Sequence, residues 1–559
     1  MSSHADNKGT HGHGYQFRPW YRIRQLILVD RSDIYLIVTF ALLVAILSLA
    51  TPIAVEAMVS TVMFGVLLWP IIWLAVALFG FMFLSGLIRV AEVYVIEILQ
   101  RRIFVRVVER FSRLIPRVQM TEFNHEYGPA LINRFFDVQK VQKSMATLLL
   151  DGIELVLIII VGLTVLAFYH PLLLAFDVGL IVCLILLILL GRGGVKTSIE
   201  ESHVKYEVAE WLQELARIPR TIRTAGGPVI AVNRADHLAH EYVIARKAHF
   251  SIVFRQFSFA VLIQIVANVL LLGLGGWLVT KQELTIGQLI ASELIIAMVV
   301  NSLLKIYKYL DSWYDLFTGV EKLGVIDDLP TERDTGAPLP ARPVGISIKV
   351  QDATFRIYNQ TKFFPNFTIR SGEKIALVGS AGVGKSVLLD FFSGFKEPTS
   401  GVVSLDGVSL KELQLESVRQ QVSVVHELEI INGTVYDNIL LRREALTVEQ
   451  ISEALDRAGI LNIVNHLEDG LQTRLMPNGR PLSETEAMRL CIARAIVAGP
   501  RLLVLDGVLD RLDLEECPRL LETLFAENAP WTLVVVTRNQ EILDRCDRVL
   551  NLDYSEVDA

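Results

Sequence analysis

The chain has 559 residues, a formal net charge of −7 and 52% hydrophobic residues. Its mean hydropathy of +0.45 is higher than that of ordinary soluble proteins and predicts a membrane part. The negative net charge gives no sign of a basic surface, so we expect no DNA or RNA partner. The four cysteines are scattered without a C-x-x-C pair, which indicates neither a disulfide framework nor a zinc site.

The first 33 residues are polar and basic, and we expect them to form a cytoplasmic N-terminal tail. They do not resemble a signal peptide, because the first apolar stretch begins only near Ile34 and is too long for the apolar region of one. His4, His11 and His13 lie in this tail. Three histidines in a polar tail are weak evidence for a metal site, and we assign them no role.

From Ile34 to about Gly319, long apolar runs alternate with charged stretches. A bilayer crossing requires an apolar helix of about 20 residues. Six runs meet this length, which predicts an all-α transmembrane domain of six helices over residues 34–320. The predicted spans are 34–63, 66–96, 148–168, 172–191, 257–279 and 286–304.

The connections between these spans differ in charge. Those after the first, third and fifth spans are short and contain Lys281 as their one lysine or arginine, whereas those after the second and fourth are long and rich in both. Positively charged connections stay in the cytoplasm, so we expect both termini and the two long connections to be cytoplasmic. Apolar residues at helical spacing predict that the spans continue past the lipid as long cytoplasmic extensions.

Two features of the predicted membrane domain allow alternative interpretations. Each long connection contains a proline-bounded break, at 116–129 and at 219–228. Either break can hold a short transverse element that presses on a cytoplasmic domain, or only a turn. Glu56 and Glu293 lie inside spans toward the outer side. They either line an outward cavity or hydrogen-bond between helices.

Residues 321–345 are rich in proline and charge and predict a linker. A domain over residues 346–559 follows, in which strand-like runs alternate with helical stretches. This alternation predicts an α/β domain with a mainly parallel sheet. The strand-like runs are ISIKV, KIALVG, VSVV, RLLVLD and WTLVVVT.

A glycine-rich loop follows the run KIALVG and precedes apolar residues at helical spacing. The loop fits the P-loop pattern G-x-x-x-x-G-K-[ST], whose backbone N–H groups cradle phosphates. Lys385 is expected to reach the terminal phosphates and Ser386 to bind Mg²⁺, while the helix points its positive end at the same anion. The predicted phosphate-binding residues are Gly379, Ser380, Ala381, Gly382, Val383, Gly384, Lys385 and Ser386.

Six spans, two broken cytoplasmic connections and a P-loop domain on one chain resemble a half-transporter of the ABC exporter family with type I architecture. The segments ATPIAVEAM, YGPALINRFFDVQKVQK and WLVTKQELTIGQLIASELI are similar to bacterial exporters of the type I secretion group. The resemblance implies a multi-pass protein of the bacterial inner membrane that binds ATP and Mg²⁺ and dimerises with a second half-transporter. Members of this group commonly work with a periplasmic adaptor, which is a further expected partner.

The resemblance also implies roles for individual residues. The segment RLLVLDGVLDRLD is similar to the Walker B segment, in which Asp506 matches the Mg²⁺-supporting aspartate. Gly507 stands where the family has a catalytic glutamate. Arg538 stands at the position of the γ-phosphate-sensing histidine, and His426 at the usual glutamine of the Q-loop.

Two further nucleotide contacts follow from the same resemblance. LSETE, from Leu482 to Glu486, occupies the place of the LSGGQ signature. It keeps Leu482 and Ser483 of that motif, and Glu484 replaces a glycine. Tyr358 is expected to be the aromatic residue that stacks on adenine.

These departures predict a degenerate catalytic site. Loss of the residue that orients and deprotonates water is expected to slow hydrolysis by about 10²–10⁴, and Asp510 is the acid that could replace it. Glu484 adds bulk and negative charge where a glycine would let the backbone approach phosphate. Arg538 supplies positive charge but no neutral imidazole acceptor.

We therefore expect an ATP-binding exporter subunit that is itself degenerate and acts with an active half. The altered signature and the missing glutamate lie in one chain, so they touch both sites of any dimer. Two alternatives stay open: a non-transporting membrane protein whose ATP binding gates or regulates a partner complex, and a homodimeric exporter with slow turnover. A neighbouring gene for an intact half favours the first interpretation, and its absence favours the second.

Overall fold

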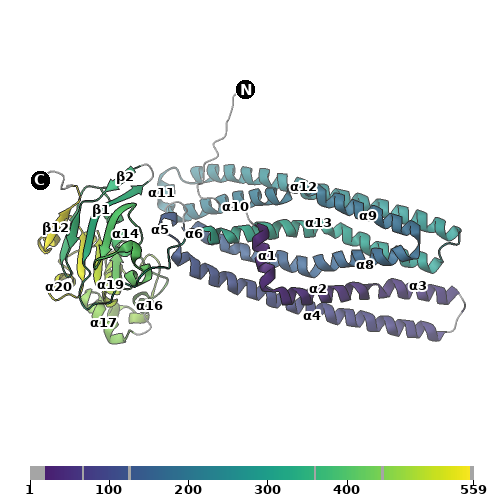
Figure 1. The fold of residues 1–559 in the computed structure, drawn as a ribbon, viewed down its shortest axis with the longest axis horizontal. Helices are drawn as coiled ribbons and strands as arrows, with labels where there is room; N and C mark the ends of the chain where they lie inside the picture. The colour runs from purple at the N-terminus through teal and green to yellow at the C-terminus, as the bar shows by residue number, and fades with distance from the viewer. Residues whose placement is uncertain are drawn as a thin grey trace, which may run out of the picture. The chain divides into compact units, whose positions relative to one another are not determined.

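A computed structural model of the chain describes residues 19–63, 65, 68–123, 128–357, 360–441 and 446–553. The chain divides into two compact units (Figure 1). The helical unit comprises Met1–Val118 and Glu122–Pro330, and the α/β unit comprises Gln119–Thr121 and Thr331–Ala559. The expected fold class, six long apolar helices followed by an α/β domain, is confirmed.

Within the described residues, six helical segments are long and apolar enough to cross a membrane. A helix rises 1.5 Å per residue, so segments of more than 30 residues exceed the roughly 30 Å of the hydrocarbon core and leave helical extensions outside it. The segments are Arg31–Met63, Leu68–Arg117, Arg134–Tyr169, Pro171–Arg217, Pro228–Thr280 and Ile286–Asp328.

Capping side chains mark the start of two of these helices. Thr285 and Gln288 form a reciprocal capping box at the start of α13, and the His170 side chain accepts a hydrogen bond from the Leu172 N–H at the start of α9. The helices from Pro19 to Asp328, of which α5 is divided between the two units, are α1 (Pro19–Val29), α2 (Arg31–Ser48), α3 (Ala50–Met63), α4 (Leu68–Leu114), α5 (Met120–Phe123), α6 (Gly128–Asn133), α7 (Asp137–Thr147), α8 (Ile153–Tyr169), α9 (Pro171–Leu190), α10 (Gly194–Arg217), α11 (Pro219–Thr224), α12 (Pro228–Thr280) and α13 (Ile286–Asp328).

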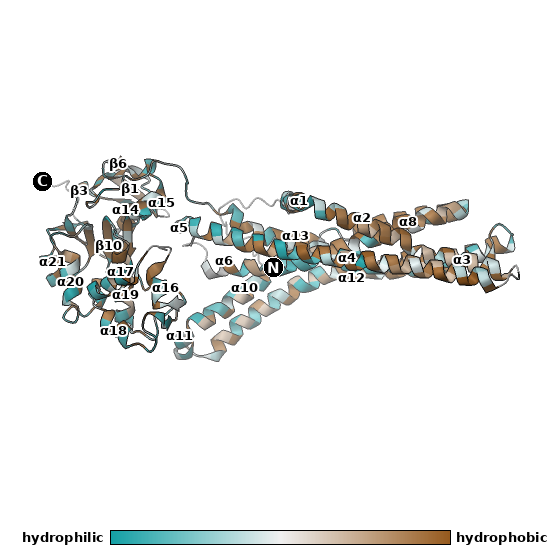
Figure 2. Cartoon of the chain, turned by 90° about the horizontal axis from the view of Figure 1, so that it is seen from below, coloured by the Kyte–Doolittle hydropathy of each residue, from teal (hydrophilic) through white to brown (hydrophobic). Residues whose placement is uncertain are grey.

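The long helices lie side by side, with α2 against α4 and α8, and α12 against α9, α10 and α13 (Figure 1). Figure 2 shows hydrophobic residues concentrated along α2, α3 and α8 and hydrophilic residues frequent along α10 and α11. The most apolar stretch of the segment Leu68–Arg117 is 0% buried. Such a continuous exposed apolar surface indicates contact with lipid or with another chain.

The proline-bounded break at 219–228 holds the six-residue helix α11, followed by a turn before α12 begins at Pro228. The break at 116–129 holds α5 and the start of α6, and residues 124–127 lie outside the described part of the chain. The segment expected as a linker begins inside a helix, because α13 continues to Asp328. Residues 321–328 are therefore helical.

The described part of the α/β unit has two five-stranded sheets and a two-stranded one made by β8 and β9. β10 pairs with β7 and β11, and β4 pairs with β11 and β12, all in parallel. The order is β12-β4-β11-β10-β7. The strand-like run ISIKV lies outside this sheet: its Ile348 begins β1, which pairs antiparallel with β2, β3 and β5 in a separate sheet. The strands are β1 (Ile348–Ile357), β2 (Gln360–Phe363), β3 (Phe367–Ile369), β4 (Lys374–Val378), β5 (Ser400–Leu405), β6 (Val408–Ser409), β7 (Val422–Val425), β8 (Gly433–Thr434), β9 (Arg474–Leu475), β10 (Leu502–Asp506), β11 (Thr532–Val536) and β12 (Arg548–Asn551).

The parallel sheet is buried on both faces. Leu503 and Leu505 belong to an apolar cluster with residues of α19 and α20, while Leu502 and Val504 belong to a second cluster with residues of α14 and β1. Successive residues of β10 pack on opposite faces of the sheet, and because both faces are buried the strand is a continuous apolar run. The helices of the unit are α14 (Lys385–Ser393), α15 (Leu415–Arg419), α16 (Val435–Leu440), α17 (Val448–Arg457), α18 (Leu461–His466), α19 (Glu484–Val497), α20 (Pro518–Phe525) and α21 (Gln540–Asp544).

A buried ion pair joins the start of this unit to its sheet. The Arg501 side chain donates to Asp406 at 2.6 Å and to the carbonyl oxygen of Val344 at 2.6 Å. Both charged side chains are nearly enclosed, at 7% and 4% exposure. Removing one partner leaves the other charge buried without compensation, which costs about 3–5 kcal/mol.

We therefore expect Arg501→Met to lower the unfolding midpoint of the α/β unit by roughly 6–20 °C in the full-length protein, measured by differential scanning fluorimetry. Arg457→Met is the matched control, because its ion pair with Glu453 lies 47% and 59% exposed and contributes under about 1 kcal/mol. Equal midpoints for the two variants would contradict the assignment of Arg501 as an anchor.

Candidate functional site

Five parallel strands end at one edge of the sheet, and the loops that follow them carry the predicted site residues. β4 leads into the glycine-rich loop 379–386, β7 into His426, β10 ends on Asp506 and β11 precedes Arg538. Because the strands are parallel, their carboxyl ends meet at the same edge, which is where ligands bind in open α/β sheets.

The glycine-rich loop has the backbone shape that the motif requires. Gly379, Gly382 and Gly384 adopt φ angles of 153°, 80° and 115°, in a region that side chains other than glycine rarely occupy. Lys385 Nζ donates to the carbonyl oxygens of Gly379 and Ser380, each at 2.8 Å, and so closes the loop on itself. No side chain caps α14 at Gly384, which leaves its first N–H groups directed at the loop.

Ser386, Asp506 and His426 meet beside this loop. The Ser386 hydroxyl donates to Asp506 Oδ2 at 3.0 Å, and His426 Nδ1 lies 2.8 Å from the same oxygen. The hydrogen bond to Asp506 raises the pKa of His426 above its usual value. Burial alone would raise the pKa of Asp506, but the bonds from His426 and Ser386 outweigh burial and hold it below its usual range.

The residues after β10 and β11 are tied to one another. Gly507 has a φ of 66°, a conformation that favours glycine, and an added Cβ would meet open space there. Asp510, the acid considered as a substitute base, accepts from the Thr537 hydroxyl and from the Arg538 N–H. Both carboxylate oxygens are thereby engaged in holding the loop after β11, so Asp510 acts as an anchor of that loop.

The LSETE segment forms the start of α19. Ser483 caps the helix by accepting from the Glu486 N–H, and the Glu486 carboxylate accepts from the Ser483 N–H at 2.7 Å. Glu484 is the first residue of the helix, and Leu482 is buried beside it. Acidic residues in the first turn stabilise a helix through its dipole, and they also cancel the positive end that would bind an anion. Helix α19 packs on α16, α17 and β7.

Asp553 is a contact of the glycine-rich loop that the sequence motif does not include. Its carboxylate accepts from the Ser380 N–H and from the Ser380 hydroxyl, each at 2.7 Å. β12 pairs with β4, which brings the two residues together. Tyr358, expected to stack on adenine, lies outside the described residues.

The sequence analysis did not single out several other charged residues inside the predicted spans. Arg89 on α4 forms an ion pair with Glu154 on α8, and Glu92 and Asp177 are buried, with no hydrogen-bond partner for their carboxylates within the described part of the chain. Each of these residues is a charged residue in or beside an apolar run, so the sequence alone could have marked it as a candidate functional residue. Of the two residues that were singled out, Glu56 accepts a hydrogen bond from Tyr169 at 2.6 Å, as in the helix-to-helix alternative.

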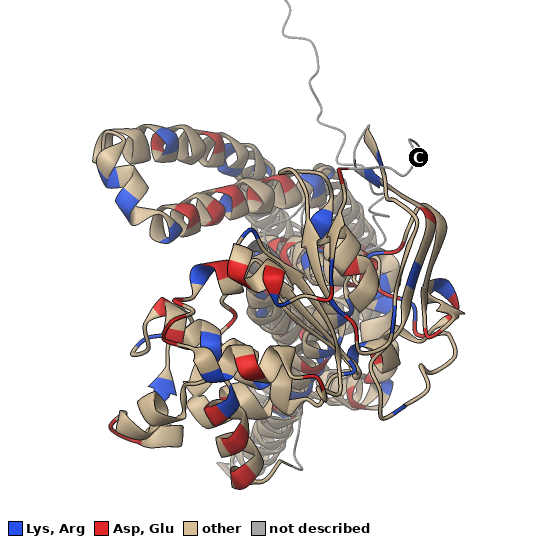
Figure 3. Cartoon of the chain, turned by 90° about the vertical axis from the view of Figure 1, so that its left-hand side faces the viewer, with Lys and Arg blue, Asp and Glu red and all other residues tan. Residues whose placement is uncertain are grey.

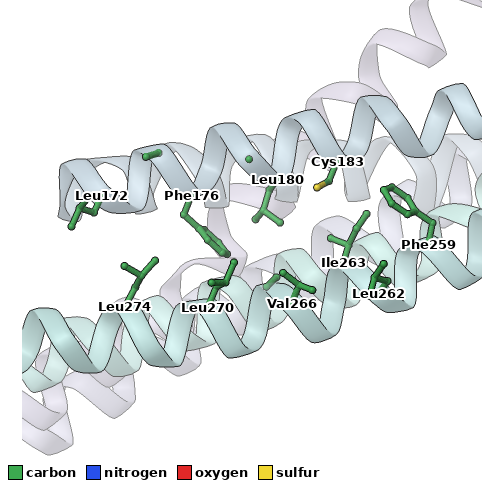
Figure 4. A pocket seen from close by; sticks show the side chains of 13 residues that line it. Leu172, Phe176, Leu180, Cys183, Phe259, Leu262, Ile263, Val266, Leu270 and Leu274 are labelled. Atoms are coloured by element: carbon green, nitrogen blue, oxygen red, sulfur yellow. The ribbon is translucent and has the colours of Figure 1, made fainter.

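An apolar cavity of about 470 Å³ lies between α9 and α12. Figure 4 shows Phe176 and Leu180 from one helix facing Leu270 and Ile263 from the other. Its lining residues carry no charge. On the α/β unit, acidic and basic residues are interspersed over the face turned to the viewer in Figure 3.

The donors beside the glycine-rich loop fit a divalent metal. A serine hydroxyl and an aspartate carboxylate are oxygen ligands of the kind that Mg²⁺ takes, together with the phosphates of a nucleotide. Ser386 and Asp506 are within 3.0 Å of each other, so both can reach one ion. His426 Nδ1 donates to the same Asp506 oxygen at 2.8 Å and orients that carboxylate.

Comparison with protein families finds two matches. The model described as "ABC transporter transmembrane region" matches residues 34–303, and the one described as "ABC transporter" matches residues 365–509. A solved structure, a bacterial Atm1-family ABC exporter with ATP bound, superposes with a TM-score of 0.82, covers 94% of each chain and shares 19% identity. At this identity the likeness concerns the fold.

The curated relatives are matched over smaller shares of their own length. A lactococcin transport/processing ATP-binding protein of Lactococcus lactis is 22% identical over 95% of this chain and 75% of its own length. A lipid A-core flippase of Vibrio vulnificus is 23% identical over 87% and 84%. An alpha-hemolysin translocation protein of Proteus vulgaris is 27% identical over 53% of this chain, and the match spans less than half, 42%, of that relative.

Proposed function

Since the chain belongs to the ABC transporter family and has the architecture of a type I exporter half, we propose that it is the ATP-binding subunit of an exporter dimer in a bacterial inner membrane. It couples nucleotide binding to export and is itself catalytically degenerate. We further propose that residues 1–33, 34–320, 321–345 and 346–559 are its tail, membrane domain, linker and nucleotide-binding domain.

The observation that carries this proposal is the contrast between two parts of one site. The glycine-rich loop, Lys385, Ser386 and Asp506 have the arrangement needed to hold a nucleotide and its metal. Gly507 provides no carboxylate beside Asp506, and its positive φ disfavours residues that could. Binding is therefore expected to persist while hydrolysis is slow.

The proposed partner is a second half-transporter that supplies an intact glutamate, histidine and signature, with a periplasmic adaptor as a further component. A neighbouring gene for such a half supports this pairing. Purification from the native membrane, followed by identification of any co-purifying half-transporter, tests it. Recovery of the chain as a homodimer alone would contradict the pairing.

A second candidate function is favoured by the start of α19. Glu484 and Glu486 place two carboxylates in the first turn of the helix that faces phosphate in the family. In any dimer this opposes closure on a nucleotide, which suits a membrane protein whose ATP binding gates or regulates a partner complex. A co-purifying partner that is not a half-transporter would favour this function.

The proposed topology places the α12–α13 connection outside and α11 in the cytoplasm. We expect Thr280→Cys, at the exposed end of α12, to react with an impermeant thiol reagent added outside intact cells, above the background of the native cysteines. Arg220→Cys on α11 should react only after the cells are opened. External labelling of Arg220→Cys would contradict this topology.

A further inference from the structure

A second cavity of the helical unit, of about 730 Å³, lies between the α9–α10 junction and α13. This volume is in the range of small-ligand sites. The charged residues of its lining are two cations, Arg192 and Lys196, and one acid, Glu200. The cavity therefore combines an apolar surface with an excess of positive charge. The apolar and aromatic side chains of the lining are Ile188, Val195, Ile199, Leu310, Trp313 and Tyr314.

Both cations of this cavity are available to an anion. The Arg192 and Lys196 side chains are exposed, and within the residues that the structure describes neither forms an ion pair or a side-chain hydrogen bond. Arginines elsewhere in the unit are paired, as Arg102 is with Asp33. Glu200 lies one helical turn beyond Lys196, away from α9. The positive charge at the α9–α10 junction is thus not neutralised by the chain itself.

The turn that carries the two cations is anchored to α13. Gly193 has a φ of 91°, a conformation that favours glycine. Gly194 approaches α13 so closely that an added Cβ would lie 2.5 Å from the Tyr314 ring. The Tyr314 hydroxyl also donates to the carbonyl oxygen of Gly191 at 3.3 Å. The positions from which the cations extend are therefore fixed relative to the apolar lining.

The cavity lies at the boundary between hydrocarbon and water. Helix α9 has 20 residues and ends at Leu190, so at 1.5 Å per residue it spans the roughly 30 Å of a hydrocarbon core. Arg192 follows directly, at the level of the lipid headgroups. Trp313 of the lining packs against Trp20 of α1, with ring centroids 5.8 Å apart, and Trp20 is largely exposed. Tryptophans gather at this level of a membrane.

We propose that this cavity binds an anionic phospholipid, with its phosphate on Arg192 and Lys196 and the adjoining part of its acyl chains on the apolar lining. Charge complementarity and the position at headgroup level favour this occupant. A soluble anion would use the cations but would leave the apolar lining exposed to water. The inference goes beyond the proposed exporter function and does not depend on ATP turnover. The proposed topology assigns the lipid to the cytoplasmic leaflet.

The test is native mass spectrometry of the full-length protein in detergent. It measures the affinities for dioleoylphosphatidylglycerol and dioleoylphosphatidylcholine, which share acyl chains and differ in headgroup charge. We expect the wild type to prefer phosphatidylglycerol. Arg192→Gln combined with Lys196→Gln should weaken its binding about 30-fold, because each basic residue near an anionic lipid contributes about 1 kcal/mol. Binding of phosphatidylcholine should not change.

The matched control is Arg24→Gln combined with Arg31→Gln, which removes the same charge from exposed positions outside the cavity. This control and Arg192→Lys, which keeps the charge, are expected to retain the wild-type affinity for phosphatidylglycerol.

Three results would overturn the inference. The first is a wild type that does not distinguish the two lipids. The second is an equal loss of affinity in both double variants, which would indicate diffuse attraction to the whole surface. The third is full displacement of phosphatidylglycerol by inorganic phosphate, which would assign the cations to a soluble anion.

Discussion

The combined variant Gly507→Glu, Arg538→His, Glu484→Gly, Thr485→Gly and Glu486→Gln is expected to release phosphate faster than the sum of its single changes allows. Groups that act as one catalytic unit are strongly non-additive, so one restored member recovers little while the others are absent. In the combined variant, the restored general base by itself is expected to raise the rate of hydrolysis by about 10²–10⁴.

The structure adds a reason why Gly507→Glu alone should recover little. The backbone at this position has a φ of 66°, and a side chain there costs about 1–2 kcal/mol or shifts the loop. Glu484 also remains at the start of α19. The measurement is steady-state phosphate release from the purified homodimer in one lipid. It compares the wild type, the single variants and the combined variant. The combined variant with Lys385→Ala added gives the background rate. Full activity from Gly507→Glu alone would contradict the account.

Lys385→Ala is expected to weaken MgATP binding by roughly 1.5–3 kcal/mol, which is about 10–150-fold, because charge-assisted phosphate contacts contribute this much. The ammonium group now bonds two loop carbonyls, those of Gly379 and Ser380, so the variant also loosens the loop. Isothermal titration calorimetry measures the change.

Lys411→Ala, a change of an exposed lysine in the same unit, is the control for loss of charge. Its affinity should match the wild type. Equal affinity in Lys385→Ala and Lys411→Ala would show that the glycine-rich loop does not hold phosphate.

Much of the architecture was predictable because apolar length and arginine placement are local properties of the sequence. The six long helices follow from runs such as residues 68–88, which have the length and apolar composition of a bilayer crossing. The α/β domain follows from the alternation of strand-like and helical runs. ISIKV could be named as a strand-like run, but its sheet could not be predicted, because an isolated apolar run does not reveal which strands it pairs with. β1 pairs with β5 across an antiparallel register that depends on residues far along the chain.

The site residues also divide into those that the sequence could identify and those that required the structure. The glycine-rich loop is one continuous motif, so its residues could be named from the sequence. The contact of His426 with Asp506 depends on β7 lying beside β10, and that of Asp553 with Ser380 on β12 lying beside β4. Sheet order is set by tertiary packing and not by chain order, so these contacts required the structure. The buried Glu92 was a signal in the sequence that the interpretation passed over.

The most direct test of the central claim measures nucleotide occupancy and phosphate release on the same purified protein in the same lipid. The account predicts saturable, metal-dependent ATP binding that Lys385→Ala weakens, with steady-state turnover well below that of the combined restoring variant. Substantial wild-type turnover, matching the combined variant at equal occupancy, would contradict it.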